Sequence, residues 1–261
     1  MGLSLLQFQP LNLMKLPLFL PLALCAALPV VAPAASVIVN EINAGGASMP
    51  GDWFELVVVG DGTAGSTVDM RGWSMRVDNN GTTGQGFFTL SNDSYWSNVR
   101  AGTILTFHED NTANNGLDSG INIVNNFNTL GWAHTNIWVG DSTYINILAG
   151  NYDGSFPIDE KNSQIAIFNA SNGLVFGPSG ENQVGYPGSG VSATEIFKLE
   201  ADPSPLITLT SPYNDGSTST FGAPNEWNGG ASRQSFAAFI PEPSALLLGA
   251  LGALGFMRRR R

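Results

Sequence analysis

The sequence predicts an all-β domain, a β-sandwich of roughly 200 residues between two terminal segments that lie outside the fold. Charged residues make up only 12% of the 261 residues, and the chain contains 31 glycines. This composition favours short strands and tight turns over a helical bundle. Turn residues recur between short apolar runs without a sustained helical period, which favours a sandwich. Six Trp and 15 Phe supply apolar surface for a core.

The expected strands are short β-branched or apolar runs bounded by Gly, Asn and Asp. In chain order they cover residues 36–42, 52–59, 68–77, 104–107, 165–168, 174–176 and 195–199. Gly72 is expected to bend the third strand. Asn172-Gly173 stands between two apolar runs and predicts a hairpin. Because Glu55 interrupts the apolar second strand, we expect one face of that strand to be solvated.

A long polar region, about 108–161, interrupts this series of strands. It contains apolar runs at 121–124 and 144–148, so we expect an elaborated insertion with room for extra strands rather than one loose loop. The sandwich is expected over 36–226. Residues 227–240 include Gly229-Gly230 and are expected to be a linker toward the C-terminal tail.

Two tryptophans and two glutamates stand out within the expected strands. Trp53 and Trp73 are expected to fill the core, each burying about 150–250 Å². Glu41 and Glu55 are expected to be exposed or paired at the edge of the sandwich. Arg71 and Arg76 are candidate partners for them, and a role as cation ligands is the alternative.

The N-terminal segment has the features of a secretory signal. An apolar run at 16–31 follows Lys15, and Ala32 and Ala34 occupy the −3 and −1 positions of a cleavage after Ala34. We therefore expect a signal peptide within residues 1–35, handled by the Sec translocon and signal peptidase. Met14 is an alternative start that gives a more typical signal length.

Cys25 is the one cysteine of the chain, and it lies in this apolar run. It raises the alternative of a lipoprotein signal, but Leu24 stands where such signals need a small residue. Removal of the run leaves a mature protein without a thiol, which excludes disulfides and cysteine chemistry there.

The C-terminus has three parts. Pro241-Glu242-Pro243 is followed by an apolar stretch, 244–257, and by four arginines. A 14-residue helix rises roughly 21 Å, which is short for a permanent anchor in a hydrocarbon core of about 30 Å. The arginines are expected to stay in the cytoplasm, which leaves the main domain outside. Glycines at every third position from 249 to 255 give a flat face for close contact within a membrane.

This tail closely resembles the PEP-CTERM sorting signal of Gram-negative bacteria. The resemblance implies cleavage near the Pro-Glu-Pro motif by an exosortase, a membrane enzyme, after a transient stay in the inner membrane. It also implies an association with exopolysaccharide and biofilm systems. The sorting signal is expected over 241–261, with a transmembrane helix at 244–257 and the processing residues Pro241, Glu242, Pro243, Arg258, Arg259, Arg260 and Arg261.

The strand segments resemble a lamin-tail domain, which is an immunoglobulin-like β-sandwich. The matching pieces, in order, are residues 40–43, 52–56, 68–75, 101–105, 165–175 and 222–225. The insertion departs from the family pattern. The resemblance implies a fold and a binding or structural habit, not a reaction.

Charge separates the ends from the middle. Lys15 and Arg258 to Arg261 are five of the 11 basic residues, whereas only Glu242 of the 21 acidic residues lies in the ends. The middle therefore has six basic and 20 acidic residues, a formal charge of −14. A domain this acidic repels nucleic acid and anionic lipid headgroups, so we expect no nucleic-acid partner.

Residues typical of catalytic sites are scarce. His108 and His134 are the two histidines, the chain has no G-x-S-x-G stretch, and His108-Glu109-Asp110 is not an HExxH motif. We expect structural or surface roles for both histidines.

Calcium is the cofactor that the sequence leaves open. Asp, Asn and Gly gather at 78–81 and 110–118, although their spacing does not fit an EF-hand loop. Tight turns without metal are the competing interpretation. The candidate ligands are Asp78, Asn80, Asp110, Asn114 and Asp118.

Together these features predict a non-enzymatic, exported protein of the cell surface or extracellular matrix. Its expected partners are the exosortase and exopolysaccharide, with Trp132, Trp138 or Tyr144 stacking on sugars. Two alternatives remain open: a secreted hydrolase acting on polysaccharide or nucleic acid, and a calcium-dependent adhesion module.

Overall fold

The computed structural model describes residues 35–45, 51–79, 82–109, 122–123, 127–146, 158, 163–181, 196–216 and 218–242. The chain divides into two compact units, Met1–Ala32 and Pro33–Arg261, and every described residue belongs to the second. The expected signal peptide, with Ala32 and Ala34, and the expected membrane segment 244–257 lie outside the described residues. Among the described residues, no helix has the length and apolar character needed to cross a membrane.

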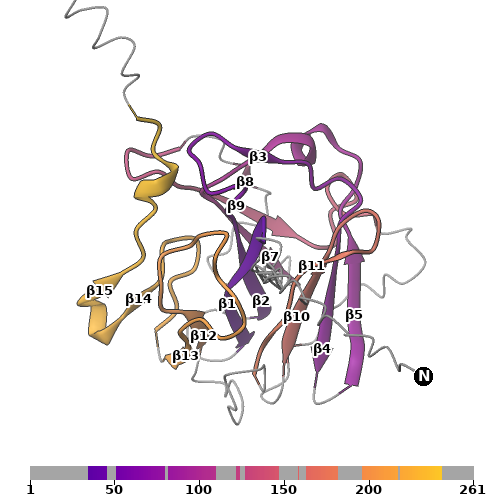
Figure 1. The fold of residues 1–261 in the computed structure, drawn as a ribbon. Helices are drawn as coiled ribbons and strands as arrows, with labels where there is room; N and C mark the ends of the chain where they lie inside the picture. Colours follow the sequence, from indigo (N-terminus) through magenta and orange to yellow (C-terminus); the bar gives the residue numbers. More distant parts are fainter. Residues whose placement is uncertain are drawn as a thin grey trace, which may run out of the picture. The chain divides into compact units, whose positions relative to one another are not determined.

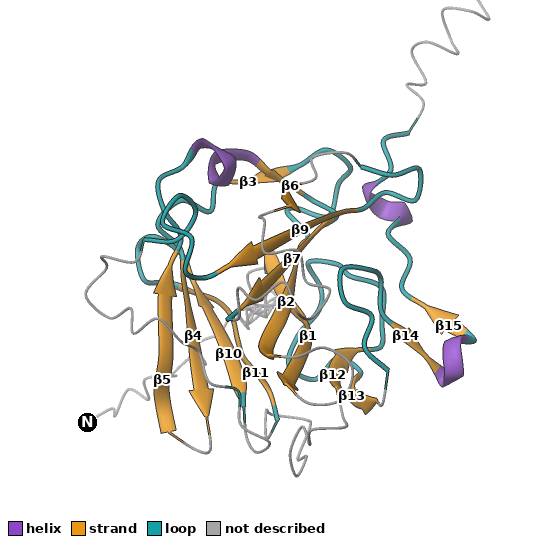
Figure 2. Ribbon diagram, turned by 180° about the vertical axis from the view of Figure 1, so that it is seen from behind, coloured by secondary structure: helices purple, strands orange, loops and turns teal. Residues whose placement is uncertain are grey.

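The described part of the chain is mainly β, as predicted, and contains several sheets (Figures 1 and 2). Its helical elements are the short 3₁₀ turns η1 (Ser94–Asn98), η3 (Asn228–Gly230) and η4 (Ala237–Phe239). The strands are β1 (Val37–Gly45), β2 (Gly51–Val58), β3 (Thr67–Val68), β4 (Ser74–Asn79), β5 (Thr82–Thr89), β6 (Val99–Arg100), β7 (Thr103–His108), β8 (Asn122–Ile123), β9 (Ala133–Trp138), β10 (Gln164–Phe168), β11 (Leu174–Gly180), β12 (Ile196–Leu199), β13 (Tyr213–Gly216), β14 (Glu226–Trp227) and β15 (Ser232–Arg233).

Two larger sheets organise these strands. The first has the order β13-β12-β1-β2-β7-β9-β8, and the second has the order β11-β10-β4-β5. In Figure 1 the four strands of the second sheet stand side by side. Strands β7 and β9 pair in parallel, whereas the other strand pairs of the two sheets are antiparallel.

The strands with strong local patterns lie close to where the sequence places them. The first two, the fourth and the last correspond to β1, β2, β7 and β12, and the Asn172-Gly173 hairpin joins β10 to β11. The expected strand over 68–77 is instead divided between β3 and β4, because the chain turns at Gly72 with a φ of +70°. The expected insertion contributes β8 and β9 to the first sheet.

One hydrophobic core contains side chains from both sheets. Phe54 on β2 stacks on Phe107 of β7 with ring centroids 5.3 Å apart, and Phe88 of β5 lies 5.3 Å from Phe107. These three rings therefore join the first sheet to the second. Trp73 belongs to this core, as predicted. The immunoglobulin-like, lamin-tail-like assignment stays a prediction.

The other face of the first sheet is also covered by protein. Because side chains alternate along β2, Trp53 and Glu55 point away from the side of Phe54. Trp53 is fully buried there against Phe221, with ring centroids 5.2 Å apart. The solvated face that we expected for β2 is therefore absent, because a segment late in the chain closes over it.

The expected linker at 227–240 is folded in the structure. It contains the end of β14, then η3, β15 and η4. Within it, the Gln234 amide donates hydrogen bonds to the oxygens of Asn40 (2.9 Å), Leu199 (3.1 Å) and Ala201 (2.9 Å). Phe236 and Phe239 are buried. The domain therefore continues to the edge of the Pro-Glu-Pro motif.

Candidate functional site

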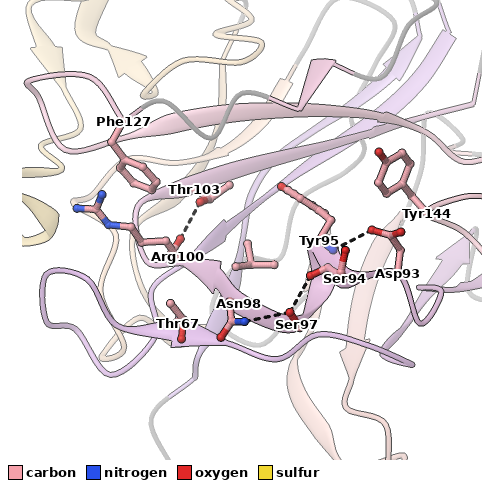
Figure 3. Close-up of a pocket in the computed structure, with 11 residues that line it drawn as sticks. Thr67, Asp93, Ser94, Tyr95, Ser97, Asn98, Arg100, Thr103, Phe127 and Tyr144 are labelled. Carbon is pink, nitrogen blue, oxygen red and sulfur yellow. Dashed lines mark hydrogen bonds between the residues drawn. The ribbon is translucent and has the colours of Figure 1, made fainter.

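A groove of about 760 Å³ runs beside η1. Figure 3 shows Arg100 and Phe127 at one end and Tyr144 and Asp93 at the other. Its lining residues are Thr67, Asp93, Ser94, Tyr95, Ser97, Asn98, Val99, Arg100, Thr103, Phe127 and Tyr144. The groove thus combines aromatic rings with hydroxyl, amide and guanidinium groups, and Asp93 is the one carboxylate among its described lining residues.

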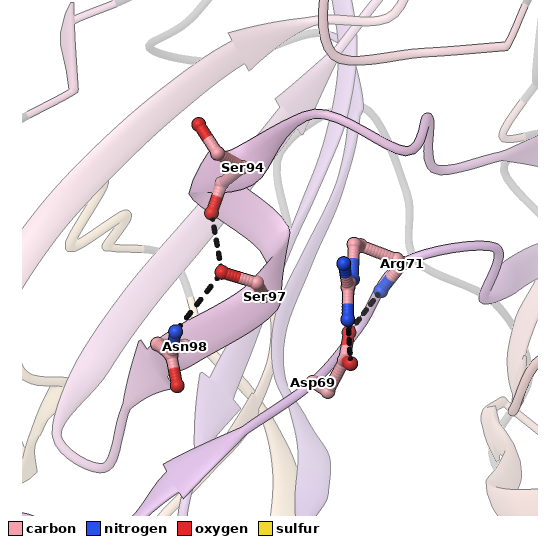
Figure 4. A network of polar contacts seen from close by, with 5 residues as sticks. All are labelled: Asp69, Arg71, Ser94, Ser97 and Asn98. Carbon is pink, nitrogen blue, oxygen red and sulfur yellow. Dashed lines mark hydrogen bonds and ion pairs between the residues drawn. The ribbon is translucent and has the colours of Figure 1, made fainter.

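The polar wall of the groove is the turn η1 itself. The Asp93 carboxylate caps this turn by accepting a hydrogen bond from the backbone N–H of Tyr95 (2.8 Å). Asn98 donates from Nδ2 to the Ser97 hydroxyl (3.0 Å), which in turn donates to the Ser94 carbonyl (2.7 Å) (Figure 4). These bonds hold a row of small polar side chains in a fixed arrangement along the wall.

The bidentate ion pair of Asp69 and Arg71 lies close to this row (Figure 4). Arg71 donates from Nε to Oδ1 (2.9 Å) and from Nη2 to Oδ2 (2.5 Å) of Asp69. The hydrogen bonds from Arg71 lower the pKa of Asp69 to about 2. Arg71 is therefore paired with Asp69 and not with either strand glutamate, contrary to our expectation.

Tyr95 and Tyr144 give the groove its aromatic surface. Their rings meet edge to face, with centroids 5.9 Å apart, and both side chains are half-buried. The Tyr95 hydroxyl donates to Thr135 of β9 (2.8 Å), which fixes its ring, and burial raises its pKa. Tyr144 is less enclosed, so its ring is the groove's more accessible apolar surface.

Arg100 connects the groove to the end of the domain. Its guanidinium lies 3.8 Å from the centroid of the Phe127 ring, a cation–π geometry. The same guanidinium donates from Nη2 to the carbonyl oxygen of Phe239 (3.2 Å). The segment before the tail is thereby tied to β6.

The start of the sorting motif lies at the surface directly after this tie. Phe236 and Phe239 are buried with ring centroids 5.9 Å apart, whereas Ile240 is 39% exposed. Pro241 and Glu242 are exposed, and they are the last residues that the structure describes. Two of the expected processing residues are thus accessible, and Pro243 with Arg258, Arg259, Arg260 and Arg261 lies outside the described residues.

The two strand glutamates are fully buried, which corrects our expectation of exposure at an edge. Glu41 on β1 lies opposite Glu55 on β2 in the sheet register. Glu41 accepts hydrogen bonds from the Thr220 hydroxyl (2.5 Å) and backbone N–H (3.0 Å). Glu55 accepts from the Thr106 hydroxyl (2.9 Å) and from the Gly222 N–H (2.5 Å). The segment that covers this face of the sheet is therefore anchored on both carboxyl groups.

Burial controls the protonation of this pair. Desolvation, followed by the charge of Glu41, raises the pKa of Glu55 to about 8. Desolvation also raises the pKa of Glu41. The hydrogen bonds from Thr220 and the charge of Lys198 lower this pKa, but their effect is smaller. Lys198 is 1% exposed, and its Nζ donates to the carbonyl oxygens of Thr218 (2.9 Å) and Glu226 (2.6 Å). The pair is closed to solvent, and it anchors the segment that covers this face of the sheet.

The histidines belong to the same face of the sheet. His134 Nε2 lies 2.9 Å from the Thr106 hydroxyl, which also bonds to Glu55, and its ring meets Phe221 edge to face at 5.5 Å. Burial, with a smaller contribution from His108, lowers the pKa of His134 to about 4. His108 is 2% exposed. The structural role expected for each histidine agrees with this placement.

The structure places one of the five calcium candidates. Asp78 receives two hydrogen bonds from Arg76, at 2.8 and 2.7 Å, and a third from the Gly84 N–H (2.8 Å). Arg76 therefore pairs with Asp78 and not with a strand glutamate. Asn80, Asp110, Asn114 and Asp118 lie outside the described residues. Within the described ranges, no group of three or more His, Cys, Asp or Glu side chains is placed to hold a metal.

The three aromatic residues that we expected to stack on sugars have different environments. Tyr144 lines the groove, whereas Trp138 donates from Nε1 to the Glu109 carbonyl (3.1 Å). Trp132 packs partly against the core. Sequence reasoning missed Tyr95, Arg100 and Phe127, because the groove joins segments separated along the chain. The local signal for η1 was Asp93 before Ser94, a typical N-cap pattern.

Residues 239–261 match the family of the PEP-CTERM protein-sorting motif. Searches of curated proteins and of solved structures found no match. The family match starts at Phe239, the buried residue whose carbonyl oxygen is held by Arg100. The chain therefore carries a C-terminal motif that marks it as an exported surface protein sorted and processed by an exosortase.

Proposed function

We propose that the protein is a non-enzymatic component of the cell surface or extracellular matrix of a Gram-negative bacterium, and that it binds exopolysaccharide. The groove beside η1 carries this proposal, because it presents an aromatic ring next to a fixed row of hydroxyl and amide groups. Sugars offer an apolar ring face and hydroxyl groups, which such a surface complements. The sorting motif brings the domain to the compartment where exopolysaccharide accumulates.

The groove chemistry favours binding over hydrolysis. Glycoside hydrolysis uses a pair of carboxyl groups that flank the scissile bond. Among the described lining residues, Asp93 is the one carboxylate, and one of its oxygens already caps η1. The groove is thus arranged to hold a sugar chain without a second carboxyl group beside it.

The test compares how tightly the unchanged protein and a variant without the Tyr144 ring bind the exopolysaccharide purified from the producing bacterium. Tyr144→Ala removes the accessible ring but keeps the backbone carbonyl that accepts a hydrogen bond from Trp96 Nε1 (2.8 Å). We expect affinity to fall about tenfold or more, which corresponds to about 1.4 kcal/mol. Isothermal titration calorimetry or co-sedimentation measures this loss.

Trp227→Ala is the matched control, since it removes a half-buried aromatic side chain from β14, which does not line the groove. The control should bind as the unchanged protein does. Equal binding by all three proteins, or no binding by any, contradicts the groove as the contact site. New reducing ends during incubation contradict the non-enzymatic role.

A further inference from the structure

An exposed apolar surface lies beside the start of the sorting motif. Leu130 is 58% exposed and Ile240 is 39% exposed, and with Trp132 and Ala237 they line a shallow groove of about 270 Å³. We call these four residues the junction patch. Apolar residues that are contiguous on the surface are a feature of sites that contact an apolar partner.

The junction patch is held rigidly by the turn that precedes β9. The Asn128 side-chain oxygen accepts hydrogen bonds from the backbone N–H groups of Leu130 (2.9 Å) and Trp132 (3.3 Å). Gly131 has a φ of +88°, and a Cβ there would lie 2.5 Å from the Phe236 carbonyl oxygen and 2.8 Å from Ile240 Cγ1. This close approach seats Leu130 next to the segment that leads into the tail.

The path of the chain brings the junction patch to a membrane. Ile240 is four residues before position 244, where the apolar stretch of the sorting motif begins. Four residues span at most about 14 Å. The headgroup layer alone is about 5–8 Å thick on each side of the hydrocarbon core. When the tail is in the bilayer, the patch is therefore within reach of the interface.

The charge around the patch agrees with contact to lipid. The middle of the chain is strongly acidic, yet no carboxylate is among the described residues that line the patch groove. The charged residue that lines it is Arg233, whose side chain is 46% exposed and whose Nε lies 3.5 Å from Oε1 of Glu226, so the edge of the groove has no net charge from this pair. Trp at such a position is typical of proteins that contact the membrane interface.

We propose that the junction patch rests on the lipid surface while the uncleaved tail is in the membrane. This contact holds the domain in one orientation and keeps Pro241 and Glu242 at a fixed height for the processing enzyme. The proposal rests on insertion of the sorting tail in the bilayer. The proposed occupant of the patch is lipid. The test also shows whether a protein occupies the patch instead.

The test uses residues 35–261, the chain that remains after the expected signal cleavage and that contains no cysteine, inserted in phosphatidylcholine vesicles. A single cysteine at position 130 or 174 carries an environment-sensitive fluorophore. Leu174 is the matched control, because it is 56% exposed and lies on β11 of the second sheet. We expect lipid-borne quenchers to reduce the emission at 130 at least threefold more than at 174. Aqueous iodide should have the opposite preference.

Vesicle flotation separates failure of the patch from failure of the anchor. If the chains float but the labels at 130 and 174 are quenched equally, the proposed lipid contact is wrong and the membrane anchor is still supported. Chains that do not float overturn both. If the label at 130 becomes shielded from iodide only when exosortase is present, the occupant is the enzyme and the lipid proposal is wrong. As a second variant, Leu130→Ser should make Trp132 more accessible to iodide in vesicles, whereas Leu174→Ser should not.

Discussion

Glu41 on β1 and Glu55 on β2 place two carboxyl groups opposite each other in the water-excluded layer between the first sheet and the late segment that covers it. Two ions there would repel each other and lose their hydration, so at least one carboxyl group keeps its proton at neutral pH. Their hydrogen bonds to Thr220, Thr106 and Gly222 show why polar groups remain in this layer: they fasten the late segment to the sheet.

This pair predicts how the stability of the domain depends on pH. A carboxyl group with a raised pKa in the folded state binds more protons folded than unfolded, so stability falls as pH rises from about 4.5 to about 8. His134 has a lowered pKa and acts oppositely, but only between about 4 and 6.5. The change in stability between pH 6.5 and pH 8 therefore reports the titration of the glutamates. The Tm should fall across this pH range.

Glu55→Gln removes the titrating proton and should flatten this fall, which thermal unfolding at several pH values measures. A loss of 1 kcal/mol corresponds to about 2–4 °C in a domain of this size. Glu226→Gln alters a glutamate whose side chain is 42% exposed and should keep the slope of the unchanged protein. A Tm that is constant or rises from pH 6.5 to 8, or a slope that Glu55→Gln leaves unchanged, contradicts this assignment.

At the scale of elements, the sequence predicted the strands that carry their own signal. β1, β2 and β7 are each built on a short β-branched or apolar run, and Asn172, with a φ of +60°, makes the β10–β11 turn. The parallel partner β9 had no comparable signal, because its sequence mixes His134 and Asn136 with apolar residues. His134 Nε2 lies 2.9 Å from the Thr106 hydroxyl of β7, a contact 28 residues apart in sequence that a local pattern does not show.

The contact between the turn before β9 and the end of the chain also depends on distant partners. Gly102, with a φ of +92°, lies where a Cβ would be 2.4 Å from the Gly131 carbonyl oxygen and 3.1 Å from Phe239 Cβ. Gly65 has a similar φ of +81° and open space around it. Both glycines permit a left-handed backbone, but only Gly102 also permits this close packing.

This difference predicts that Gly102→Ala destabilises the domain more than Gly65→Ala. Both variants strain the backbone, and the first adds an overpacking cost of about 1–3 kcal/mol. Urea unfolding of the two variants measures the difference in free energy of unfolding. Equal losses would show that the segment around Phe239 is not packed on Gly102.

At the scale of the whole molecule, the sorting motif and the domain are continuous. The sequence identified the motif from three adjacent parts, and the family match confirms it. It missed that the domain extends to Ile240, because the bonds that hold this segment cross long separations: Gln234 reaches Asn40, 194 residues away. For the same reason, Tyr144 was expected at a sugar site, but Tyr95 and Arg100, which line the same groove, were not.

A folded segment that ends at Ile240 leaves Pro241 and Glu242 exposed directly after it. Processing there removes the apolar stretch and the arginines without disturbing the buried Phe236 and Phe239. The mature protein is then expected to keep its domain intact and lose the basic tail. What remains is the acidic middle of the chain, whose side chains suit a soluble matrix protein.

Mass spectrometry of the protein recovered from the surface or matrix of the producing cell tests this account most directly. The predicted mass corresponds to a chain that ends near Pro241-Glu242-Pro243 and lacks residues 258–261. The same sample from a strain without exosortase should retain the tail and remain with the membrane. A mature protein that still carries all four terminal arginines in the wild-type strain would contradict the account.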